Sequence, residues 1–286
     1  MPQFDYNLAF SRNLGWVTEE EQKRLKSARI AIAGMGGVGG VHLLTLARLG
    51  VENFRIADFD QFELANFNRQ IGATVSSIGK PKTEILKNMA LDINPNINIE
   101  VYDQGINEDN LESFLSGSDV YLDGLDFFCI PIRELLFPLA RKMNIPVTTV
   151  GPVGMGAALM NFLPGKMTFD QYFGLSSTND PEEKAIRFLA GLSLSGIHQK
   201  YLADYSKVDF KNKKAPSTMM GCQLSSGIAA TEILKIILKR GPVLAAPYNI
   251  QFDAYLNRTV VKKLWFGYKN PLHQIKLYII RKILLK

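Results

Sequence analysis

The sequence has few cysteines, and it lacks both a membrane-spanning run and a secretory signal. Only Cys129 and Cys222 occur among 286 residues, a number and spacing that predict neither a zinc site nor a disulfide framework. No uninterrupted apolar run approaches the roughly 20 residues needed to cross a bilayer. Residues 1–13 contain no apolar core preceded by basic residues. We therefore expect a protein of the reducing cytoplasm without bound zinc.

Acidic residues are missing from the last part of the chain. Residues 254–286 contain eight Lys or Arg and no Asp or Glu, whereas the whole chain carries a formal net charge of +6. The excess charge therefore belongs to this basic C-terminal tail and not to the rest of the chain. Three interpretations stay open for it: a docked helix with snorkelling lysines, contact with an anionic membrane surface, or contact with nucleic acid or an acidic protein. The second would place the protein at the periphery of the inner membrane surface.

Strand-like and helix-like segments alternate through the first half of the chain. A capping box formed by Thr18 and Glu21 opens a short helix that runs to about Ser27. Apolar runs rich in β-branched residues predict strands at 29–33, 53–57, 97–102, 120–122 and 147–150. Helical periodicity lies between them, at 38–49, 79–93, 108–115 and 132–143. This alternation predicts a Rossmann-like α/β fold, a doubly wound and mostly parallel sheet.

The pattern changes after Gly151. Further strands are predicted at 156–162, 248–252 and 259–264, and we expect them to continue the sheet as an antiparallel second half. Residues 163–215 are loop-rich, with helical pieces near 181–190. A long helix over 218–239 is expected to be capped by Ser217.

A glycine-rich turn separates the first predicted strand from its helix. Gly34, Gly36, Gly37 and Gly39 permit a tight turn and let backbone N–H groups approach a phosphate at the helix N-terminus. Asp58 follows the next strand, where an acid would hold ribose hydroxyls. Taken alone, the turn and Asp58 fit the dinucleotide site of a hydride-transfer enzyme equally well.

Additional polar side chains favour a nucleoside triphosphate. Arg69 and Lys82 would neutralise the phosphates and stabilise a departing pyrophosphate, although each could also be an ordinary surface residue. Asn66 and Gln70 add neutral hydrogen-bonding groups one helical turn apart. Asp126, at another strand end, could coordinate Mg²⁺, which prefers one or two carboxylates plus phosphate oxygens. The carboxyl ends of parallel strands share one sheet edge, so we expect a common site for ATP and Mg²⁺.

In order and spacing these motifs resemble the ThiF/MoeB/HesA family, the adenylation domains related to ubiquitin-activating E1 enzymes. The resemblance covers roughly residues 10–239 and rests on residues 34–39, 58–60, 66–70, 79–82, 123–126 and the helix over 221–239. It implies an N-terminal helical arm (1–28), an E1-like adenylation domain (29–264) and the basic C-terminal tail (265–286). Within the domain, residues 29–151 would be the nucleotide-binding half and residues 152–264 the crossover and substrate half.

The resemblance also implies roles for single residues. Asp58 would bind the ribose, while Asn66, Arg69 and Lys82 would hold the phosphates. Asp126 would place Mg²⁺. Arg12 is the best match to a family arginine that reaches into the partner subunit's site, which implies a homodimer with a shared active site.

The activity that the resemblance implies is ATP-dependent adenylation of a carboxylate, with release of pyrophosphate. The substrate class would be the C-terminal carboxylate of a small ubiquitin-like or sulfur-carrier protein. Two alternatives remain: a dehydratase that activates a carboxylate on a tRNA nucleoside, and a non-catalytic E1-like binding scaffold. The basic tail slightly favours the dehydratase, while the lack of a known RNA-binding motif weighs against it. The scaffold is disfavoured because Arg69, Lys82 and Asp126 are all present.

The cysteines depart from the family pattern. Many relatives carry two Cys-x-x-Cys pairs for zinc, and this chain has neither. Residues 163–215 contain no cysteine for a thioester step. Cys222 lies in the first turns of the long helix, where the helix dipole could lower its thiol pKa. It is a weak candidate nucleophile, and both Cys222 and Cys129 fit a structural role better.

Overall fold

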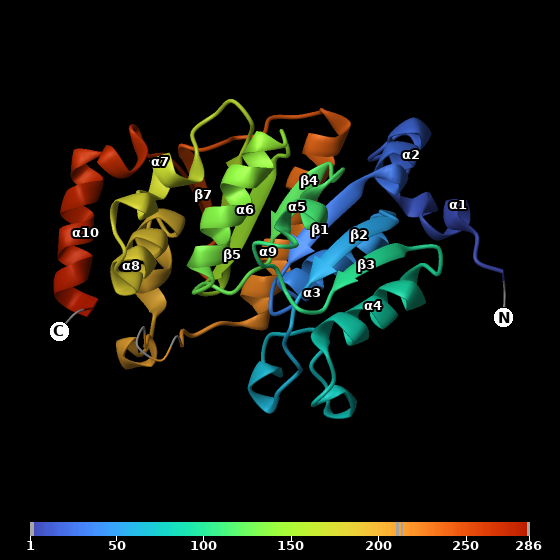
Figure 1. Cartoon of the computed structure of the whole chain (residues 1–286), viewed down its shortest axis with the longest axis horizontal. Coiled ribbons are helices and arrows are strands. Elements are labelled where there is room, and N and C mark those ends of the chain that lie inside the picture. Colours follow the sequence, from blue (N-terminus) through green and yellow to red (C-terminus); the bar gives the residue numbers. More distant parts are fainter. Residues whose placement is uncertain (1–2, 210–211, 213, 285–286) are drawn as a thin grey trace.

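A computed structural model describes residues 3–209, 212 and 214–284. The remaining positions, which include the start of the arm, part of the loop-rich segment and Lys286, lie outside the described residues. Within the described part, one sheet has the strand order β3-β2-β1-β4-β5-β6-β7-β8 (Figure 1). Its strands are β1 (Arg29–Ala33), β2 (Asn53–Ala57), β3 (Asn98–Tyr102), β4 (Val120–Asp123), β5 (Val147–Val153), β6 (Gly156–Phe162), β7 (Tyr248–Asp253) and β8 (Arg258–Lys263).

The sheet is parallel from β3 to β5 and antiparallel from β5 to β8. On the central strand β1, Ile32 faces Ile56 of β2 on one side and Leu122 of β4 on the other. All three side chains are fully buried, as expected for parallel strands covered on both faces. The predicted fold class, a parallel sheet followed by an antiparallel half, is confirmed.

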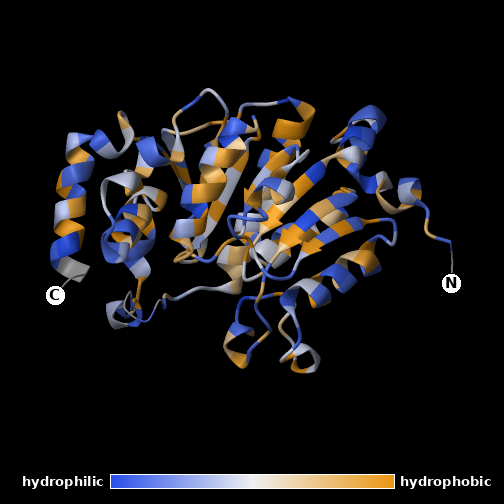
Figure 2. Cartoon of the chain, in the orientation of Figure 1, coloured by the Kyte–Doolittle hydropathy of each residue, from blue (hydrophilic) through white to orange (hydrophobic). Residues whose placement is uncertain are grey.

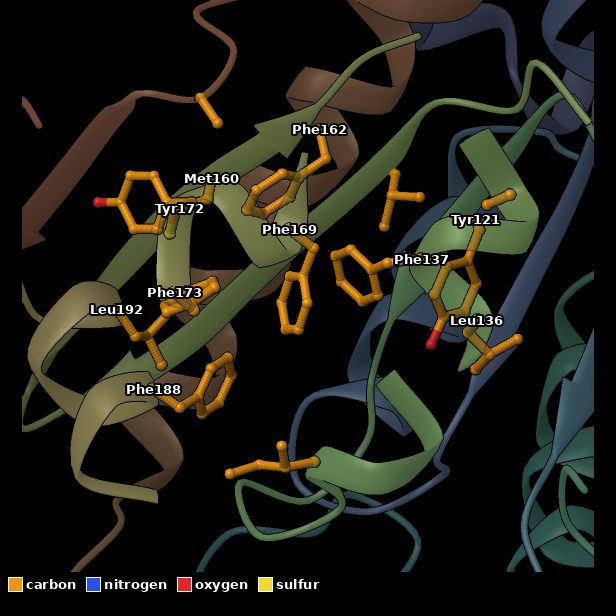
Figure 3. Packing of buried hydrophobic residues seen from close by; sticks show 14 of the residues in the cluster. Tyr121, Leu136, Phe137, Met160, Phe162, Phe169, Tyr172, Phe173, Phe188 and Leu192 are labelled. Carbon is orange, nitrogen blue, oxygen red and sulfur yellow. The ribbon is translucent and has the colours of Figure 1, made fainter. Parts of the chain in front are cut away.

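Helices cover both faces of this sheet. One core lies under α3 (Gly39–Arg48), α4 (Lys82–Ile93) and α9 (Met219–Leu238). The other lies under α5 (Leu111–Leu115), α6 (Ile130–Lys142), α7 (Phe169–Phe173) and α8 (Pro181–Leu192). This second core is strongly aromatic (Figure 3): Phe137 meets Phe162 edge to face, with ring centroids 5.4 Å apart. Figure 2 shows the apolar strands between these layers.

The N-terminal arm packs on the far end of α3. It contains α1 (Tyr6–Ala9) and α2 (Glu19–Ser27), and the predicted capping box of α2 is present. The Tyr6 hydroxyl donates to Gly50 O over 2.7 Å, and Gln22 Nε2 donates to Leu49 O over 3.0 Å. Single turns of 3-10 helix also occur: η1 (Ser11–Asn13), η2 (Leu64–Asn66), η3 (Val75–Ser77), η4 (Leu175–Ser177), η5 (Ile197–Tyr201), η6 (Tyr205–Lys207) and η7 (Gly267–Lys269).

Several predicted helix starts differ from the structure: the helix predicted from residue 108 begins at Leu111, and the one predicted from residue 132 begins at Ile130. The helix predicted from residue 79 begins at Lys82, because Gly79 has a left-handed φ of +76° and Pro81 lies in a short bridge with Gln61. The long helix is capped by Thr218 and not by Ser217. Thr218 Oγ1 accepts from the backbone N–H of Gly221 over 3.2 Å.

The basic C-terminal tail forms η7 and the helix α10 (Pro271–Leu284), which packs against α8. His273 and Leu277 of α10 are buried. The segment is therefore a docked helix, one of the three interpretations left open for it, and the two interpretations that invoke an outside partner stay predictions. No helix among the described residues is both long and apolar enough to cross a membrane.

Candidate active site

The glycine turn is closed by contacts between backbone atoms. Gly34 has a φ of +86°, and its N–H donates to Ala57 O over 2.7 Å. A Cβ on Gly34 would overlap Gly124 O, and a Cβ on Gly39 would overlap Gly34 O. Both positions therefore require glycine, since backbone atoms cannot move aside. The turn presents the N-terminus of α3, a favourable place for phosphate.

Asp58 fixes this turn through its carboxylate. Oδ2 accepts from the Met35 N–H over 2.6 Å, and Oδ1 accepts from the Asp60 N–H over 2.8 Å. Burial raises the pKa of Asp58, against the lowering effect of Lys82 and of the two N–H donors. A carboxylate has roughly four acceptor positions. Asp58 can thus hold the turn and also accept from ribose hydroxyls.

Lys82, the first residue of α4, places a buried cation beside Asp58. The residue is 5% exposed. Its Nζ donates to Asp60 Oδ2 over 2.8 Å, and its backbone N–H donates to Asp60 O over 3.0 Å. The sequence indicated Lys82 but gave Asp60 no role. Through this hydrogen bond, Asp60 positions the ammonium group of Lys82.

Of the three side chains predicted to bind nucleotide in residues 64–70, Arg69 and Gln70 lie at the glycine turn and Asn66 does not. A Cβ on Gly37 would lie 3.6 Å from Arg69 Cγ, and a Cβ on Gly36 would lie 3.6 Å from Gln70 Nε2. Arg69 Nη1 donates to Ala65 O over 2.9 Å. Asn66 differs, because its Oδ1 accepts from the Glu63 N–H over 3.0 Å and closes η2.

Gln70 provides a test of whether a ligand fits here. Its Oε1 is buried and has no hydrogen-bond partner among the described residues. Such an acceptor is normally satisfied by protein, water or ligand. Because the side chain lies against Gly36, a hydroxyl or amino donor of a nucleotide bound on the turn would fit it.

Asp126 is exposed on the loop that follows β4. This loop is organised by Arg133, whose Nε donates to Asp123 Oδ2 over 2.8 Å. Arg133 Nη1 donates to Asp126 O and Nη2 to Leu125 O, each over 2.7 Å. Arg133 and Asp123 are both buried.

Arg133 is the main site-forming residue that sequence reasoning missed. The sequence pattern that could have indicated it is an arginine on the apolar side of a helix, between Ile130 and Leu136, which are both buried. A charge at such a position requires a buried partner. Asp123, ten residues earlier at a strand end, was the obvious candidate.

The described residues contain no group of three or more His, Cys, Asp or Glu that could hold a metal ion. A magnesium ion bound with ATP does not need one, because phosphate oxygens and water supply most of its ligands. The exposed carboxylate of Asp126 fits that mode of binding.

Cys222 packs beneath the glycine turn. It is fully buried, and its Sγ lies 3.1 Å from where a Cβ on Gly37 would be. Burial raises its thiol pKa, against smaller lowering effects of Ser217 and Arg69. The direction of the shift is thus opposite to the one that an activated thiol at a helix N-terminus would show. Burial also raises the thiol pKa of Cys129.

Arg12 is not part of the site of its own chain. It is exposed in η1, on the arm that is attached to Leu49 and Gly50. Those residues lie at the opposite end of α3 from the glycine turn, about 15 Å along the helix axis. Arg12 therefore lies away from the glycine turn of its own chain.

A comparison with protein-family models matches the ThiF family over residues 10–272. The chain is similar to tRNA threonylcarbamoyladenosine dehydratase of Bacillus subtilis (strain 168), with 34% identity over 150 residues, 52% of this chain and 57% of that protein. It is also similar to the sulfur carrier protein ThiS adenylyltransferase of Escherichia coli (strain K12), with 31% identity over 143 residues, 50% of this chain and 56% of that one. The chain thus spans about half the length of the curated relatives it matches.

Solved structures share the fold. A crystal structure of E. coli MccB with AMPCPP and selenomethionine MccA has a TM-score of 0.68 and 20% identity, covering 91% of this chain and 72% of that one. A structure of selenomethionine PaaA has a TM-score of 0.63 and 22% identity, covering 85% and 66%. The family match spans residues 10–272 of 286, and on that ground the chain belongs to the ThiF family.

Proposed function

We propose that this protein is an ATP-dependent adenylyltransferase that activates a carboxylate. The observation that carries the proposal is the buried Lys82 ammonium, held by Asp60 next to the glycine turn and Asp58. A dinucleotide needs no buried cation beyond its pyrophosphate cradle. A triphosphate that expels pyrophosphate does, because negative charge develops on the leaving group.

In the proposed reaction, Asp58 holds the ribose while the N–H groups of the glycine turn hold phosphate. A carboxylate oxygen of the substrate attacks the α-phosphorus. The bond from that phosphorus to the bridging oxygen breaks, and pyrophosphate leaves with the electron pair. Arg69 and Lys82 stabilise the departing charge. Mg²⁺ held at Asp126 would neutralise phosphate oxygens.

A homodimer with a shared active site is part of the proposal. Apolar side chains stand exposed on the loops around η2 and η3, which project beyond the sheet at the bottom of Figure 1. They are Leu64 (71%), Val75 (83%) and Ile78 (46%). Exposed apolar side chains gathered in one segment are typical of protein interfaces. A second chain seated there would supply the Arg12 that the first cannot.

The proposed substrate is the C-terminal carboxylate of a small ubiquitin-like or sulfur-carrier protein. The similarity to the ThiS adenylyltransferase supports it. A dehydratase acting on a tRNA nucleoside is the second candidate, because the B. subtilis relative carries that name. A non-catalytic scaffold is the third. We also expect a cytoplasmic location.

Exchange of pyrophosphate into ATP tests the proposal. We expect purified protein with Mg²⁺ and the correct carboxylate to catalyse exchange. Asp126→Ala should abolish it, and Asp92→Ala, which removes an exposed carboxylate from α4, should not. ATP binding without exchange for any carrier protein or tRNA would favour the scaffold. Intact mass of the carrier, or of the tRNA, then identifies which one is adenylated.

A further inference from the structure

The outer side of α10 is apolar and uncovered. Leu272 (77% exposed), Ile275 (57%), Tyr278 (55%) and Ile279 (51%) form this C-terminal apolar face. Their spacing places them on one side of a helix, opposite His273 and Leu277. In Figures 1 and 2, α10 stands at the margin of the molecule with α8 on its inner side.

The inner side of α10 is bonded to α8, so the C-terminal apolar face points away from α8. Lys276 Nζ donates to Ala190 O, Ser193 O and Leu194 O at the C-terminal end of α8, over 3.1–3.3 Å. At the other end of α8, Arg281 Nε donates to Glu183 Oε2 over 2.7 Å. The two helices therefore run antiparallel, and α10 is bonded to α8 at two positions along its length.

Two cations of the tail, Lys276 and Arg281, bond to α8, and other cations remain at the surface. Lys262, Lys269 and Lys282 are exposed, and Lys282 Nζ lies 4.6 Å from the ring centroid of Tyr278. Neither Asp nor Glu occurs anywhere in residues 254–286. The C-terminal segment therefore brings only cations to the C-terminal apolar face, and Glu183 of the neighbouring α8 is bonded to Arg281.

Two exposed aromatic residues flank the start of α10. Trp265 is 58% and Phe266 74% exposed. The Asn270 side chain joins them to the helix, because its Nδ2 donates to Trp265 O over 3.1 Å and its Oδ1 accepts from the His273 N–H over 3.0 Å. Aromatic residues beside an apolar helix face and lysines are typical of the membrane–water interface.

We propose that the C-terminal apolar face binds the surface of an anionic phospholipid bilayer. Its apolar side chains would enter the boundary between headgroups and acyl chains, while the lysines remain among the phosphates. A second copy of the chain fits less well, because the exposed Lys262, Lys269 and Lys282 of one copy would be brought near the same lysines of the other. This proposal is independent of the adenylation reaction.

Co-sedimentation of the full chain with vesicles tests the proposal. We expect binding to phosphatidylcholine vesicles that contain phosphatidylglycerol, weak binding to phosphatidylcholine alone, and loss of binding at high salt. The double variant Ile275→Gln/Ile279→Gln should weaken binding more than tenfold. Each of Lys269→Gln and Lys282→Gln should weaken it about fivefold.

Leu8→Gln is the matched control, because Leu8 is 74% exposed on the distant N-terminal arm, and it should bind as the wild type does. Leu272→Gln replaces the double variant if the latter does not fold. Equal binding by wild type and the double variant would overturn the proposal, as would no binding to anionic vesicles. Self-association of the wild type that the double variant abolishes would instead assign the face to a second copy.

Discussion

Lys82 Nζ donates to Asp60 Oδ2 over 2.8 Å, and this pair joins a side chain that is 6% exposed to one that is 52% exposed. Among the described residues, the carboxylate that bonds the buried ammonium is that of Asp60, which is half exposed, while Asp58 lies nearby. An exposed ion pair stabilises a fold little, whereas a buried cation without a partner is costly. A phosphate beside Asp60 would therefore be a favourable second partner for Lys82.

The first prediction separates the two members of this pair. Lys82→Met should lower the exchange rate constant about 10²–10³-fold, because it removes a cation that stabilises the departing charge. Asp60→Asn keeps the cation but weakens the hydrogen bond that positions the Lys82 ammonium group, so it should mainly raise the KM for ATP. Steady-state exchange kinetics measure both values. Equal losses of kcat in the two variants would argue that Asp60 itself acts in the reaction.

The second prediction concerns the buried pair of Arg133 and Asp123. Arg133→Met leaves a buried carboxylate unpaired and should lower the free energy of unfolding by about 3–5 kcal/mol. Arg133 also holds the carbonyl of Asp126, so more Mg²⁺ should be needed for half-maximal exchange. Denaturant titration and a Mg²⁺ titration measure these effects. Lower stability with an unchanged Mg²⁺ requirement would show that Arg133 does not position Asp126.

The third prediction tests the shared site. Arg12→Ala and Asp126→Ala should each be inactive as homodimers. In a mixed dimer, the chain that keeps Asp126 receives Arg12 from its partner, so one of the two sites is complete. Half of randomly reassembled dimers are mixed, so about a quarter of the wild-type activity should return. If mixing restores nothing while mixed dimers are present, Arg12 does not act across the interface.

The sequence predicted the fold well, because its signals are local. The β-branched run at 29–33 and the glycine turn each fix their own backbone, and the structure has β1 and the start of α3 where they were expected. Ser217 and Thr218 are both good caps, so sequence alone could not choose between them. The structure decides, because the side-chain oxygen that accepts from the Gly221 N–H is that of Thr218.

The candidate site was less predictable where it depends on contacts between distant segments. Arg133 stabilises a loop seven residues before it, and its buried partner becomes evident only when α6 is placed on the sheet. The orientation of Lys82 by Asp60 likewise joins residues 22 positions apart. The packing of Cys222 against Gly37 brings together two halves of the chain, and no spacing rule predicts it.

The fourth prediction concerns Cys222. Because the thiol is fully buried and its pKa is raised, we expect it to pack under the glycine turn and not to form a thioester. Cys222→Ala should retain exchange activity within about threefold while losing roughly 1 kcal/mol of stability. Mass spectrometry of stalled reactions should detect no thiol-sensitive adduct. An adduct in the wild type that Cys222→Ala abolishes would identify Cys222 as a nucleophile.

The fifth prediction concerns His42 on α3. Its ring is 1% exposed, and neither nitrogen has a hydrogen-bond partner among the described residues. Burial lowers the pKa of His42 to about 3, whereas an unfolded histidine titrates near 6.5. Between these two values the unfolded chain binds the extra proton. His42 therefore contributes full stability above about pH 6.5, and that stability is lost as the pH falls toward 3.

From pH 7 to pH 5 this histidine alone should lower the free energy of unfolding by about 2 kcal/mol. His42→Leu removes the titrating group and keeps the site apolar, so the difference between the two pH values should shrink by that amount. Urea titrations of wild type and variant at both pH values measure it. His198 and His273, whose pKa values burial lowers to about 4, remain in the variant and account for the residual loss. An equal loss in both proteins would show that His42 is hydrated or partnered in solution.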